Sequence, residues 1–459
     1  MQFVYVLSDF RTEDDFKSSY NNEQKIYYLP VTLNLTKNCL ISLIKVFEKT
    51  NFGLDTIPFF HERLDNFKKN VIDRNKTTLF LDSGGFSFIK GKIDPYDTAK
   101  MIECYVDFLN CYPDSFDYIF SLDIPINRKR GYEQFNSYDF IKKMNYKSLK
   151  ESVEVLNKNP ALIDKFYYVR HFIMRSQYKI WSELYNDNSI GLKQLPVNNA
   201  IGGLVKSKAI NELKFSPSIA IAYKCLFEYL NNPVYDGKIF KLHFLGVNEP
   251  VERLTNTLIE ALFDMYLKKE CLPGASFTYD TLNYDIHSTQ KIRNLNIFKL
   301  ERNEPSTFIS PLILPDDLLK EVYVQDKYVN GIKQEIEFMK ADYDPTNVSA
   351  FYPLSVFSNL QLDKYAEYLV NNELLGLFDQ QNENKVNNEI YNYCTQIKNK
   401  KYVQYFKNGS KKKFETNLKN NLKKISKFHN WFMWDRSETS LEDLMLEFID
   451  EISAADMIK

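Results

Sequence analysis

The residues best suited to chemistry in this 459-residue chain are two aspartates, Asp82 and Asp280, each of which directly follows an apolar run. Two carboxylates suit glycosyl chemistry, because one can attack the anomeric carbon while the other handles the proton of the departing group. Asp82 is followed by Gly84 and Gly85, whose missing side chains permit a tight approach of the backbone to a ligand. Taken alone, an aspartate in such a place is more often a cap for neighbouring backbone amides.

A third carboxylate, Asp123, follows the apolar run 116–122 and precedes Pro125, which ends the strand. A carboxylate accepts two parallel donors, so Asp123 suits the N1 and amine edge of a guanine-like base. The alternative is that Asp123 caps the next helix.

Glycines follow two further apolar runs. Gly202 and Gly203 let backbone amides and a carbonyl bind a planar ligand directly, although a tight turn between a strand and a helix explains them equally well. Leu245 and Gly246 close the run 239–245, which offers an apolar floor to a pocket. His243 lies in the same run, and a histidine there is more often packed inside the protein than catalytic.

Six apolar runs, each followed by a polar residue or a glycine, alternate with longer amphipathic stretches in the first part of the chain. They are residues 77–81, 116–122, 166–169, 200–201, 239–245 and 275–279. This alternation indicates repeated strand and helix units. In a parallel barrel the carboxyl ends of all strands face one way, so the residues at those ends converge on one site. We therefore expect an α/β protein with a TIM-type (β/α)8 barrel over residues 1–300.

The pattern changes after the barrel. Residues 301–316 are rich in proline and show little periodicity, which predicts a linker. Residues 317–459 contain helical patterns, such as 360–375 and 414–434, and few strand signals. They predict an appended, mainly helical domain.

This domain contains a lysine-rich segment, with eleven lysines and one acid between Lys398 and Lys427. Two interpretations stay open. The segment binds nucleic-acid phosphates, or it is a solvated helical face that the acidic stretch 435–456 balances. The lysines assigned to phosphate binding are Lys411, Lys412, Lys413, Lys423 and Lys424.

Composition narrows the class of protein. The 59 basic and 60 acidic residues give a net charge of −1, which neither indicates nor excludes a nucleic-acid partner. The six cysteines are scattered without a CxxC pair, and several lie in apolar segments, which suits reduced thiols in a cytoplasmic protein. No run reaches the roughly 18 apolar residues of a membrane span, and the amino terminus lacks a signal pattern. We expect a soluble, cytoplasmic protein.

Together and in this order, five motifs resemble those of the tRNA-guanine transglycosylase superfamily. They are DSGGF at 82–86, SLDIP at 121–125, IGGL at 201–204, LHFLGV at 242–247 and YDTLNY at 279–284. The last stretch is similar to the Phe-Asp-Ser-Ala-x-Tyr of the archaeal branch. The resemblance covers residues 75–285, and the shared order of the motifs is its most specific part.

The resemblance implies a role for each motif. Asp280 is the nucleophile that bonds to C1′ of the target nucleotide, and Asp82 is the general acid and base. Phe86 stacks on the base, and Asp123 reads its Watson–Crick edge. The other pocket residues are Gly202, Gly203 and Leu204, which supply backbone contacts, and Leu245 and Gly246, which line the walls.

The chain departs from this family in two places. The position where relatives carry a base-reading glutamine falls at Arg170 or His171. The zinc site of the tRNA-modifying relatives, a CxCxxC with a distal histidine after the nucleophile, is missing, because Cys394 is the only cysteine after Asp280. Since that zinc subdomain helps to hold tRNA, the resemblance favours the branch that inserts 7-deazaguanines into DNA.

The expected function is therefore base exchange by a pentosyltransferase. Guanine in DNA, or alternatively in tRNA, is replaced by a 7-deazaguanine such as a preQ0-like precursor, without a cofactor or a metal. A glycosidase or nucleoside hydrolase on the same barrel is one alternative, and a catalytically inactive nucleic-acid-binding subunit is another. Retention of both Asp82 and Asp280 argues against the inactive subunit. Whether the protein forms a homodimer or needs a partner protein stays open.

Overall fold

A computed structural model describes most of the chain. The described residues are 1–7, 26, 28–44, 56–70, 76–89, 93–126, 133–172, 174–204, 215–247, 249–281, 292–293, 295, 297–301, 304–378, 383–397 and 410–457. None of the helices in these ranges is long and apolar enough to cross a membrane.

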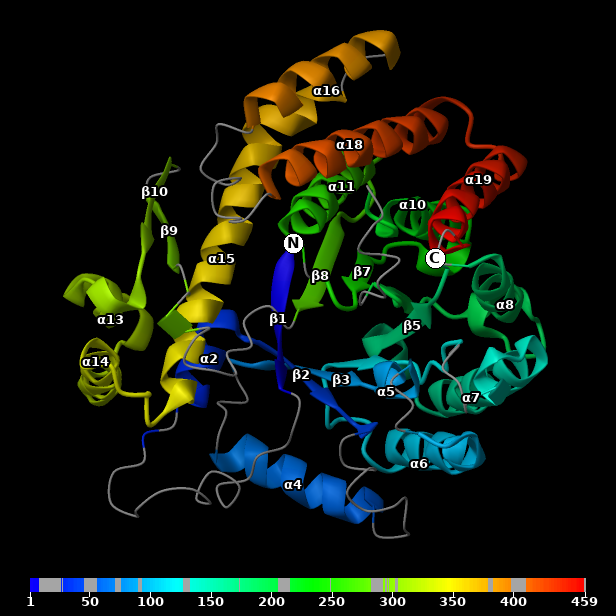
Figure 1. Ribbon diagram of the computed structural model, residues 1–459. Helices are drawn as coiled ribbons and strands as arrows, with labels where there is room; N and C mark the ends of the chain where they lie inside the picture. Colours follow the sequence, from blue (N-terminus) through cyan, green and yellow to red (C-terminus); the bar gives the residue numbers. More distant parts are fainter. Residues whose placement is uncertain are drawn as a thin grey trace.

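Eight parallel strands form a closed barrel in the order β1 to β8, and β8 pairs with β1 to close it (Figure 1). The strands are β1 Gln2–Leu7, β2 Asn38–Ser42, β3 Thr78–Asp82, β4 Tyr118–Phe120, β5 Phe166–Arg170, β6 Asn198–Ile201, β7 Phe240–Phe244 and β8 Ala275–Thr281. The TIM-type (β/α)8 fold expected from the sequence is confirmed. All six strands expected from the sequence are present. The other two, β1 and β2, were not predicted from the sequence.

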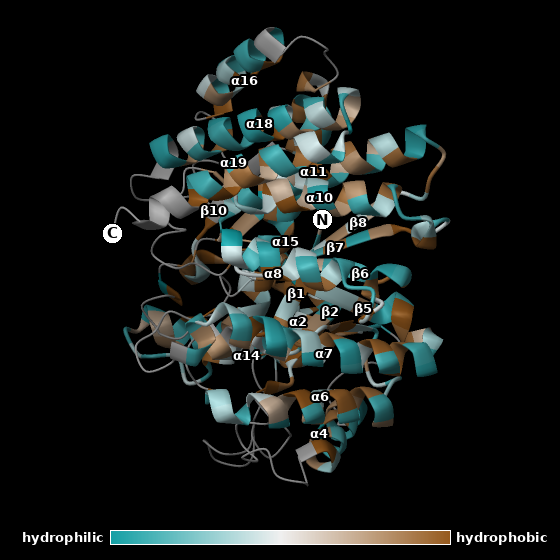
Figure 2. Ribbon diagram, turned by 90° about the vertical axis from the view of Figure 1, so that its right-hand side faces the viewer, coloured by the Kyte–Doolittle hydropathy of each residue, from teal (hydrophilic) through white to brown (hydrophobic). Residues whose placement is uncertain are grey.

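Helices surround the barrel on its outside (Figure 1). They are α2 Leu29–Thr36, α4 Thr56–Asn70, α5 Gly85–Ile89, α6 Thr98–Cys111, α7 Tyr138–Lys158, α8 Arg175–Asn186, α10 Ser218–Leu230 and α11 Pro250–Lys269. Hydrophilic and hydrophobic residues alternate around helices such as α6 and α7 (Figure 2). This pattern is typical of helices that bury one face against a sheet.

Side chains of each strand alternate between the inside of the barrel and the helical layer. In β3, Leu79 and Leu81 pack in the outer core, whereas Phe80 belongs to a separate interior cluster. Both faces of a strand are thus apolar, which explains why the apolar runs are continuous. The interior cluster consists of Val4, Leu40, Phe80, Phe120, Tyr167, Val169 and Ala200.

The segment expected to be a linker, 301–316, instead contributes to a two-stranded antiparallel sheet. Its strands are β9 Ile297–Glu301 and β10 Glu304–Ile309, and a 3-10 turn at Pro311–Ile313 follows. Helix α15 (Tyr352–Leu369) fixes β9, because Ser358 Oγ accepts a hydrogen bond from Phe298 N–H at 2.9 Å and Gln361 Oε1 accepts one from Leu300 N–H at 3.3 Å. These partners are about 60 residues apart in the sequence, so a local sequence pattern does not predict the sheet.

The carboxy-terminal region is mainly helical, as expected. Its helices are α13 Asp316–Tyr323, α14 Asp326–Lys340, α15, α16 Glu383–Ile397, α18 Ser410–Trp434 and α19 Glu438–Met457. Helices α13 and α14 form a second core with α2 and the first turns of α15. The rest of α15, together with α16, α18 and α19, shares one hydrophobic core with the barrel. The helical region therefore packs onto the barrel as an additional outer layer.

A buried polar cluster joins β8 to α11 and α15. The Tyr279 hydroxyl donates to both carboxylate oxygens of Asp363, at 2.8 and 2.6 Å. The Arg253 guanidinium lies 3.8 Å from Asp363, 2.7 Å from Asn359 Oδ1, and over the Tyr279 ring. Burial raises the pKa of Asp363 to about 6, although Arg253 and the Tyr279 hydrogen bond lower it.

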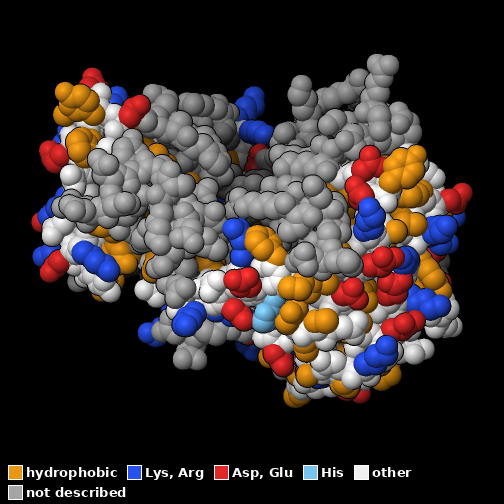
Figure 3. All heavy atoms as spheres, turned by 90° about the horizontal axis from the view of Figure 1, so that it is seen from below, with side chains coloured by type: hydrophobic (Ala, Val, Ile, Leu, Met, Phe, Trp, Pro, Cys, Tyr) orange, Lys and Arg blue, Asp and Glu red, His pale blue; other side chains and the backbone are white. Residues whose placement is uncertain are grey.

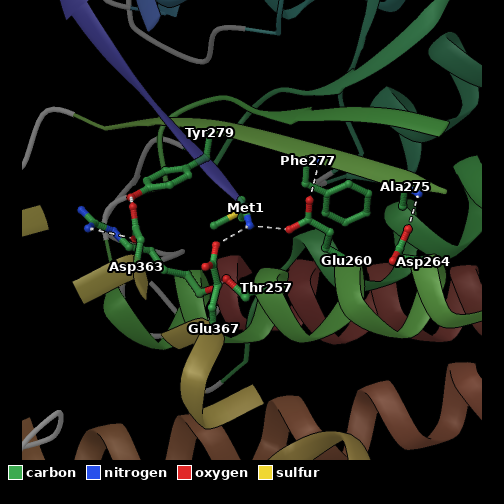
Figure 4. A network of polar contacts seen from close by, with 10 residues as sticks. Met1, Thr257, Glu260, Asp264, Ala275, Phe277, Tyr279, Asp363 and Glu367 are labelled. Atoms are coloured by element: carbon green, nitrogen blue, oxygen red, sulfur yellow. Dashed lines mark hydrogen bonds and ion pairs between the residues drawn. The ribbon is translucent and has the colours of Figure 1, made fainter. Parts of the chain in front are cut away.

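The amino terminus extends this cluster. The α-amino group of Met1 lies 2.5 Å from Glu260 and 3.4 Å from Glu367 (Figure 4). Glu260 also accepts a hydrogen bond from Phe277 N–H at 2.8 Å. Strands β1 and β8 are thus tied to α11 and α15 by charged groups behind the sheet.

The cluster predicts that Arg253→Met lowers the free energy of unfolding by about 3–5 kcal/mol, because it leaves a buried carboxylate without its cation. Urea unfolding of the full chain measures this change. Lys268→Met on the same helix breaks the exposed Lys268–Asp264 pair, and it should cost less than about 1 kcal/mol. Equal losses in the two variants would contradict a special role for Arg253.

Candidate functional site

The site lies at the carboxyl ends of the strands, where Asp82 ends β3 and Asp280 projects from β8. Asp123 follows β4 and completes a group of three carboxylates. They are close enough that Asp123 and Asp280 both raise the pKa of Asp82. The aspartates that the sequence marked as most suited to chemistry are therefore brought together.

Asp280 is held by the turn after β7. The Gly246 N–H donates to Asp280 Oδ1 at 2.6 Å, and the Val247 N–H donates to the Asp280 carbonyl at 2.9 Å. Gly246 has a φ of 83°, a left-handed conformation that glycine adopts without steric cost. His243 Nε2 lies 3.5 Å from the second carboxylate oxygen, Oδ2. Both oxygens of the carboxylate are thus oriented by the protein.

Asp82 has a different environment. Burial is the largest cause that raises its pKa to about 7, and the charges of Asp123 and Asp280 act in the same direction. Hydrogen bonds from Gly84 N–H and the Ser42 hydroxyl lower the pKa but do not offset burial. Asp82 nevertheless keeps part of its surface accessible. A reachable carboxyl with a pKa near neutrality can both give and take a proton under physiological conditions.

Asp123 is enclosed by two side-chain donors and a glycine. The Ser83 hydroxyl donates to its Oδ1 at 3.1 Å, and His171 Nε2 lies 2.6 Å from its Oδ2. A Cβ at Gly85 would overlap the Asp123 carboxylate, and a Cβ at Gly202 would lie 2.8 Å from the His171 ring. The glycines of both motifs are therefore required by the close approach of these two side chains.

Helix α7 fixes the loop that carries Asp123. The Asn145 side chain accepts a hydrogen bond from Ile124 N–H at 3.0 Å and donates to the Ile124 carbonyl at 2.9 Å. The Ser148 hydroxyl donates to the Leu122 carbonyl at 3.0 Å. The backbone on both sides of Asp123 is thus held by the barrel's outer layer.

The strand register decides between the two candidates for the base-reading position. In β5, Val169 belongs to the interior cluster and Tyr168 to the outer core, so His171 faces the site and Arg170 faces the helices. The Arg170 guanidinium pairs with Glu228 at 2.6 Å outside the barrel. The expectation that Arg170 lines the site is therefore wrong, and of the two candidates only His171 faces the site.

The other expected pocket residues are placed as follows. Leu245 packs against the interior cluster, and Gly203 has a φ of 79° beside Gly202. The Leu204 side chain lies in the outer core, which leaves only its backbone for a ligand. The Phe86 side chain and residues 282–284 lie outside the described part of the structure.

Sequence reasoning missed His243 as a partner of Asp280, and also the supporting hydroxyls of Ser42 and Thr278. His243 is fully buried, in agreement with the expectation that it packs inside, yet it contacts the carboxylate. Strand alternation was the available signal. His243 shares a strand face with Leu245, and Thr278 shares one with Asp280.

The lysines of α18 are only partly available for phosphates. Lys424 pairs with Glu451 and Lys427 with Glu447 of α19. Lys413 is exposed and lies 3.5 Å from Glu249. The two pairs with α19 support the interpretation that the acidic stretch 435–456 folds against the lysine-rich helix. Lys412 and Lys423 are exposed, whereas the side chain of Lys411 is outside the description.

Charge is also mixed elsewhere on the surface. On the face shown in Figure 3, described Lys and Arg side chains stand beside Asp and Glu side chains. Among the residues drawn in colour, this face therefore carries both positive and negative side chains.

Two further features bear on chemistry. Within the described ranges, no group of three or more His, Cys, Asp and Glu side chains is arranged to hold a metal ion. A cavity lined by Asn198, Tyr235 and Lys241 opens at the amino ends of β6 and β7, which is the opposite end of the barrel. In TIM barrels the chemistry lies at the carboxyl end, so this cavity is separate from the site.

A comparison with protein-family models finds no match for the chain, and a comparison with curated proteins finds none either. The chemical interpretation therefore depends on the site itself. It offers one carboxylate oriented by fixed donors, a second with a pKa near 7, and a third paired with an imidazole. This set suits nucleophilic attack with proton transfer beside a polar recognition point.

The close approach at Gly85 predicts that Gly85→Ala displaces the Asp123 carboxylate. The cost to the free energy of unfolding should be about 1–3 kcal/mol, and ligand binding at the site should be lost. Gly376→Ala is the matched control, because a Cβ there meets nothing within 4 Å. Thermal unfolding and ligand titration of both variants provide the measurement, and unchanged binding in Gly85→Ala would contradict the proposed crowding.

The raised pKa of Asp82 predicts a pH-dependent cost in stability. Between the ordinary pKa of 3.8 and the folded value of about 7, the folded state binds more protons than the unfolded state. The free energy of unfolding contributed by Asp82 therefore falls as pH rises through this window.

Asp82→Asn should remove this cost and stabilise the chain at pH 8 by about 1–3 kcal/mol, with little gain near pH 4. Urea unfolding at several pH values measures the difference. Asp139→Asn, at an exposed position in the first turn of α7, is the control. A gain that does not grow with pH would contradict the assignment.

Proposed function

We propose that this chain is a nucleic-acid guanine transglycosylase, an enzyme that exchanges a guanine base for a 7-deazaguanine through a covalent glycosyl-enzyme intermediate. The observation that carries the proposal is the pairing of two unlike carboxylates at one end of the barrel. Asp280 is oriented by Gly246 and His243, whereas Asp82 has a pKa of about 7. A nucleophile and a separate proton carrier need this difference.

Two half-reactions follow from these roles. In the first, an Asp280 oxygen attacks C1′ of the target nucleotide, the C1′–N9 bond breaks, and Asp82 gives its proton to the departing guanine. In the second, N9 of the incoming base attacks C1′, the bond to Asp280 breaks, and Asp82 takes the proton from N9. Each half-reaction inverts C1′, so the original configuration is restored and no water is consumed.

Asp123 is the proposed reader of the base. Guanine and 7-deazaguanines share the same N1–H and amine edge, so one carboxylate can accept from either base. The Ser83 and His171 contacts hold Asp123 in place for this task. His171 stands where the resembled family carries glutamine, and Gly202 makes room for its ring. Gly203, Leu204, Leu245 and Gly246 would complete the pocket.

DNA is the proposed polymer, with tRNA as the alternative. The chain lacks the cysteines of the zinc subdomain that the tRNA-modifying relatives use, since Cys394 is the only cysteine after Asp280. In either polymer the target nucleotide must leave its stack to reach the mouth of the barrel, at a cost of a few kcal/mol that phosphate contacts must offset. The exposed Lys412 and Lys423 are candidates for such contacts.

The test is an incorporation assay on the purified full chain. Radiolabelled guanine, or a 7-deazaguanine precursor, is incubated with DNA and, separately, with tRNA. We expect label in DNA and no abasic sites. Label in tRNA alone would reverse the choice of polymer, abasic sites would indicate a hydrolase, and no incorporation into either polymer would overturn the proposal.

The nucleophile has its own test. Asp280→Ala should abolish the covalent complex between protein and oligonucleotide, because it removes the carboxylate that is proposed to attack C1′. Denaturing electrophoresis of trapped complexes measures it. Asp114→Asn, which breaks the exposed Asp114–Lys165 pair, is the control and should form the complex normally. Persistence of the complex in Asp280→Ala would refute the assignment.

A further inference from the structure

His243 occupies the centre of the barrel directly beneath the site. It projects inward from β7, and its exposed fraction is 0%. The rings of Phe80, Phe120 and Tyr167 surround it, with ring centroids 5.9, 4.6 and 6.4 Å away. An imidazole in such apolar surroundings needs partners for both ring nitrogens, because an unpaired buried polar group is costly.

Both nitrogens have partners on β8. Nδ1 lies 2.8 Å from the Thr278 hydroxyl, and Nε2 lies 3.5 Å from Asp280 Oδ2. A carboxylate is attracted by an N–H and repelled by a nitrogen lone pair, so the proton belongs on Nε2. The Thr278 hydroxyl then donates to Nδ1, which fixes this tautomer and the orientation of the ring.

We propose that His243 is a positioning residue that donates a hydrogen bond from Nε2 to Asp280 and favours its departure from the glycosyl-enzyme. The inference rests on the proposed function. When C1′ is bonded to Asp280, the carboxylate has lost its charge. As the C1′–O bond breaks, the electron pair returns to Asp280, and the Nε2–H stabilises the charge that develops there.

The same hydrogen bond has the opposite effect on the first half-reaction. It stabilises the free carboxylate, so it disfavours attack relative to departure. His243 therefore keeps the covalent intermediate from accumulating. The separation of 3.5 Å is long for a hydrogen bond, and contacts of this kind commonly shorten when a substrate is bound.

The arrangement is not a hydrolytic triad built around Thr278. In such a triad the hydroxyl is the nucleophile and must reach the substrate. Thr278 lies one interior layer below Asp280 on the same strand, and its hydroxyl is directed to the imidazole. The chain of hydrogen bonds from Thr278 through His243 thus ends at Asp280, and Asp280 is the residue of the three that would face the substrate.

The experiment compares four variants of the full chain. His243→Phe fills the space without a donor, and His243→Gln supplies a side-chain N–H. Thr278→Val removes the hydroxyl that fixes the tautomer of His243. This variant still tests the inference if His243→Phe does not fold. Tyr167→Phe is the packing control. The covalent complex formed with a DNA duplex at a fixed free guanine concentration is measured, together with the rate of guanine exchange.

We expect His243→Phe to raise the fraction of covalent complex and to slow exchange by about 10- to 100-fold, as for the loss of a hydrogen bond to a charged group. Thr278→Val should change both in the same direction but less, and His243→Gln should restore part of the rate. Tyr167→Phe should behave as the original chain. A parallel fall of complex and exchange rate in His243→Phe and Thr278→Val would overturn the inference.

The two proposals fail differently. If the original chain exchanges guanine and His243→Gln is no better than His243→Phe, only the role of His243 is overturned. If the original chain forms no covalent complex and exchanges nothing, the proposed function fails, and the role of His243 fails with it. Nitrogen-15 NMR of the His243 ring then still reports whether Nε2 carries the proton facing Asp280.

Discussion

Three carboxylates share the enclosed mouth of this barrel, and the surrounding structure must compensate for their burial and for the repulsion between them. Carboxylates can stay charged in such a place only where donors are aimed at them. Asp280 receives the Gly246 N–H, and Asp123 receives the Ser83 hydroxyl beside His171. Asp82 has donors too, but burial and its two charged neighbours outweigh them. Asp82 is therefore the member of the group whose pKa is raised, to about 7, and the proposed difference in role between Asp82 and Asp280 depends on this distribution of donors.

The glycines of the site are a second consequence of the same crowding. Gly85 and Gly202 lie where a Cβ would meet the Asp123 carboxylate and the His171 ring. Gly246 adopts a φ of 83° so that its N–H reaches Asp280. From the sequence, Gly85 and Gly202 suggested close approach of a ligand to the backbone, and Gly246 suggested part of a pocket wall. In the structure the three glycines make room for, or bind, the protein's own side chains of Asp123, His171 and Asp280.

Much of the fold could be predicted because it depends on local patterns. Six strands, each ending in a polar residue or a glycine, were visible in the sequence, and Asp82 and Asp280 were placed correctly at strand ends. The orientation of Arg170 was also within reach, because alternation along β5 puts Val169 and His171 on one face. The antiparallel sheet of β9 and β10 was not, since its fixed backbone depends on Ser358 and Gln361 of α15.

Alternation along a strand gives the face on which His171 and His243 lie, but it does not give the aspartate that each of them contacts. His171 follows β5 and contacts Asp123, which follows the neighbouring strand β4. His243 on β7 contacts Asp280 on the neighbouring strand β8. Such contacts depend on the register between neighbouring strands, which local sequence patterns do not give. The lysine-rich helix shows a related limit. Its sequence left phosphate binding and pairing with the acidic stretch 435–456 both open, and the folded chain places Glu447 and Glu451 of α19 against two of its lysines.

Strand β8 is held on both of its faces at Asp280 and the residue before it. Asp280 faces inward, where Gly246 fixes the carboxylate, and the preceding residue, Tyr279, faces outward, where its hydroxyl binds Asp363. Arg253 keeps Asp363 from being an unpaired buried charge. The charged cluster behind the sheet and the carboxylates inside the barrel are therefore joined through one peptide unit. The role proposed for Asp280, attack and departure along a fixed direction, needs a rigid backbone of this kind.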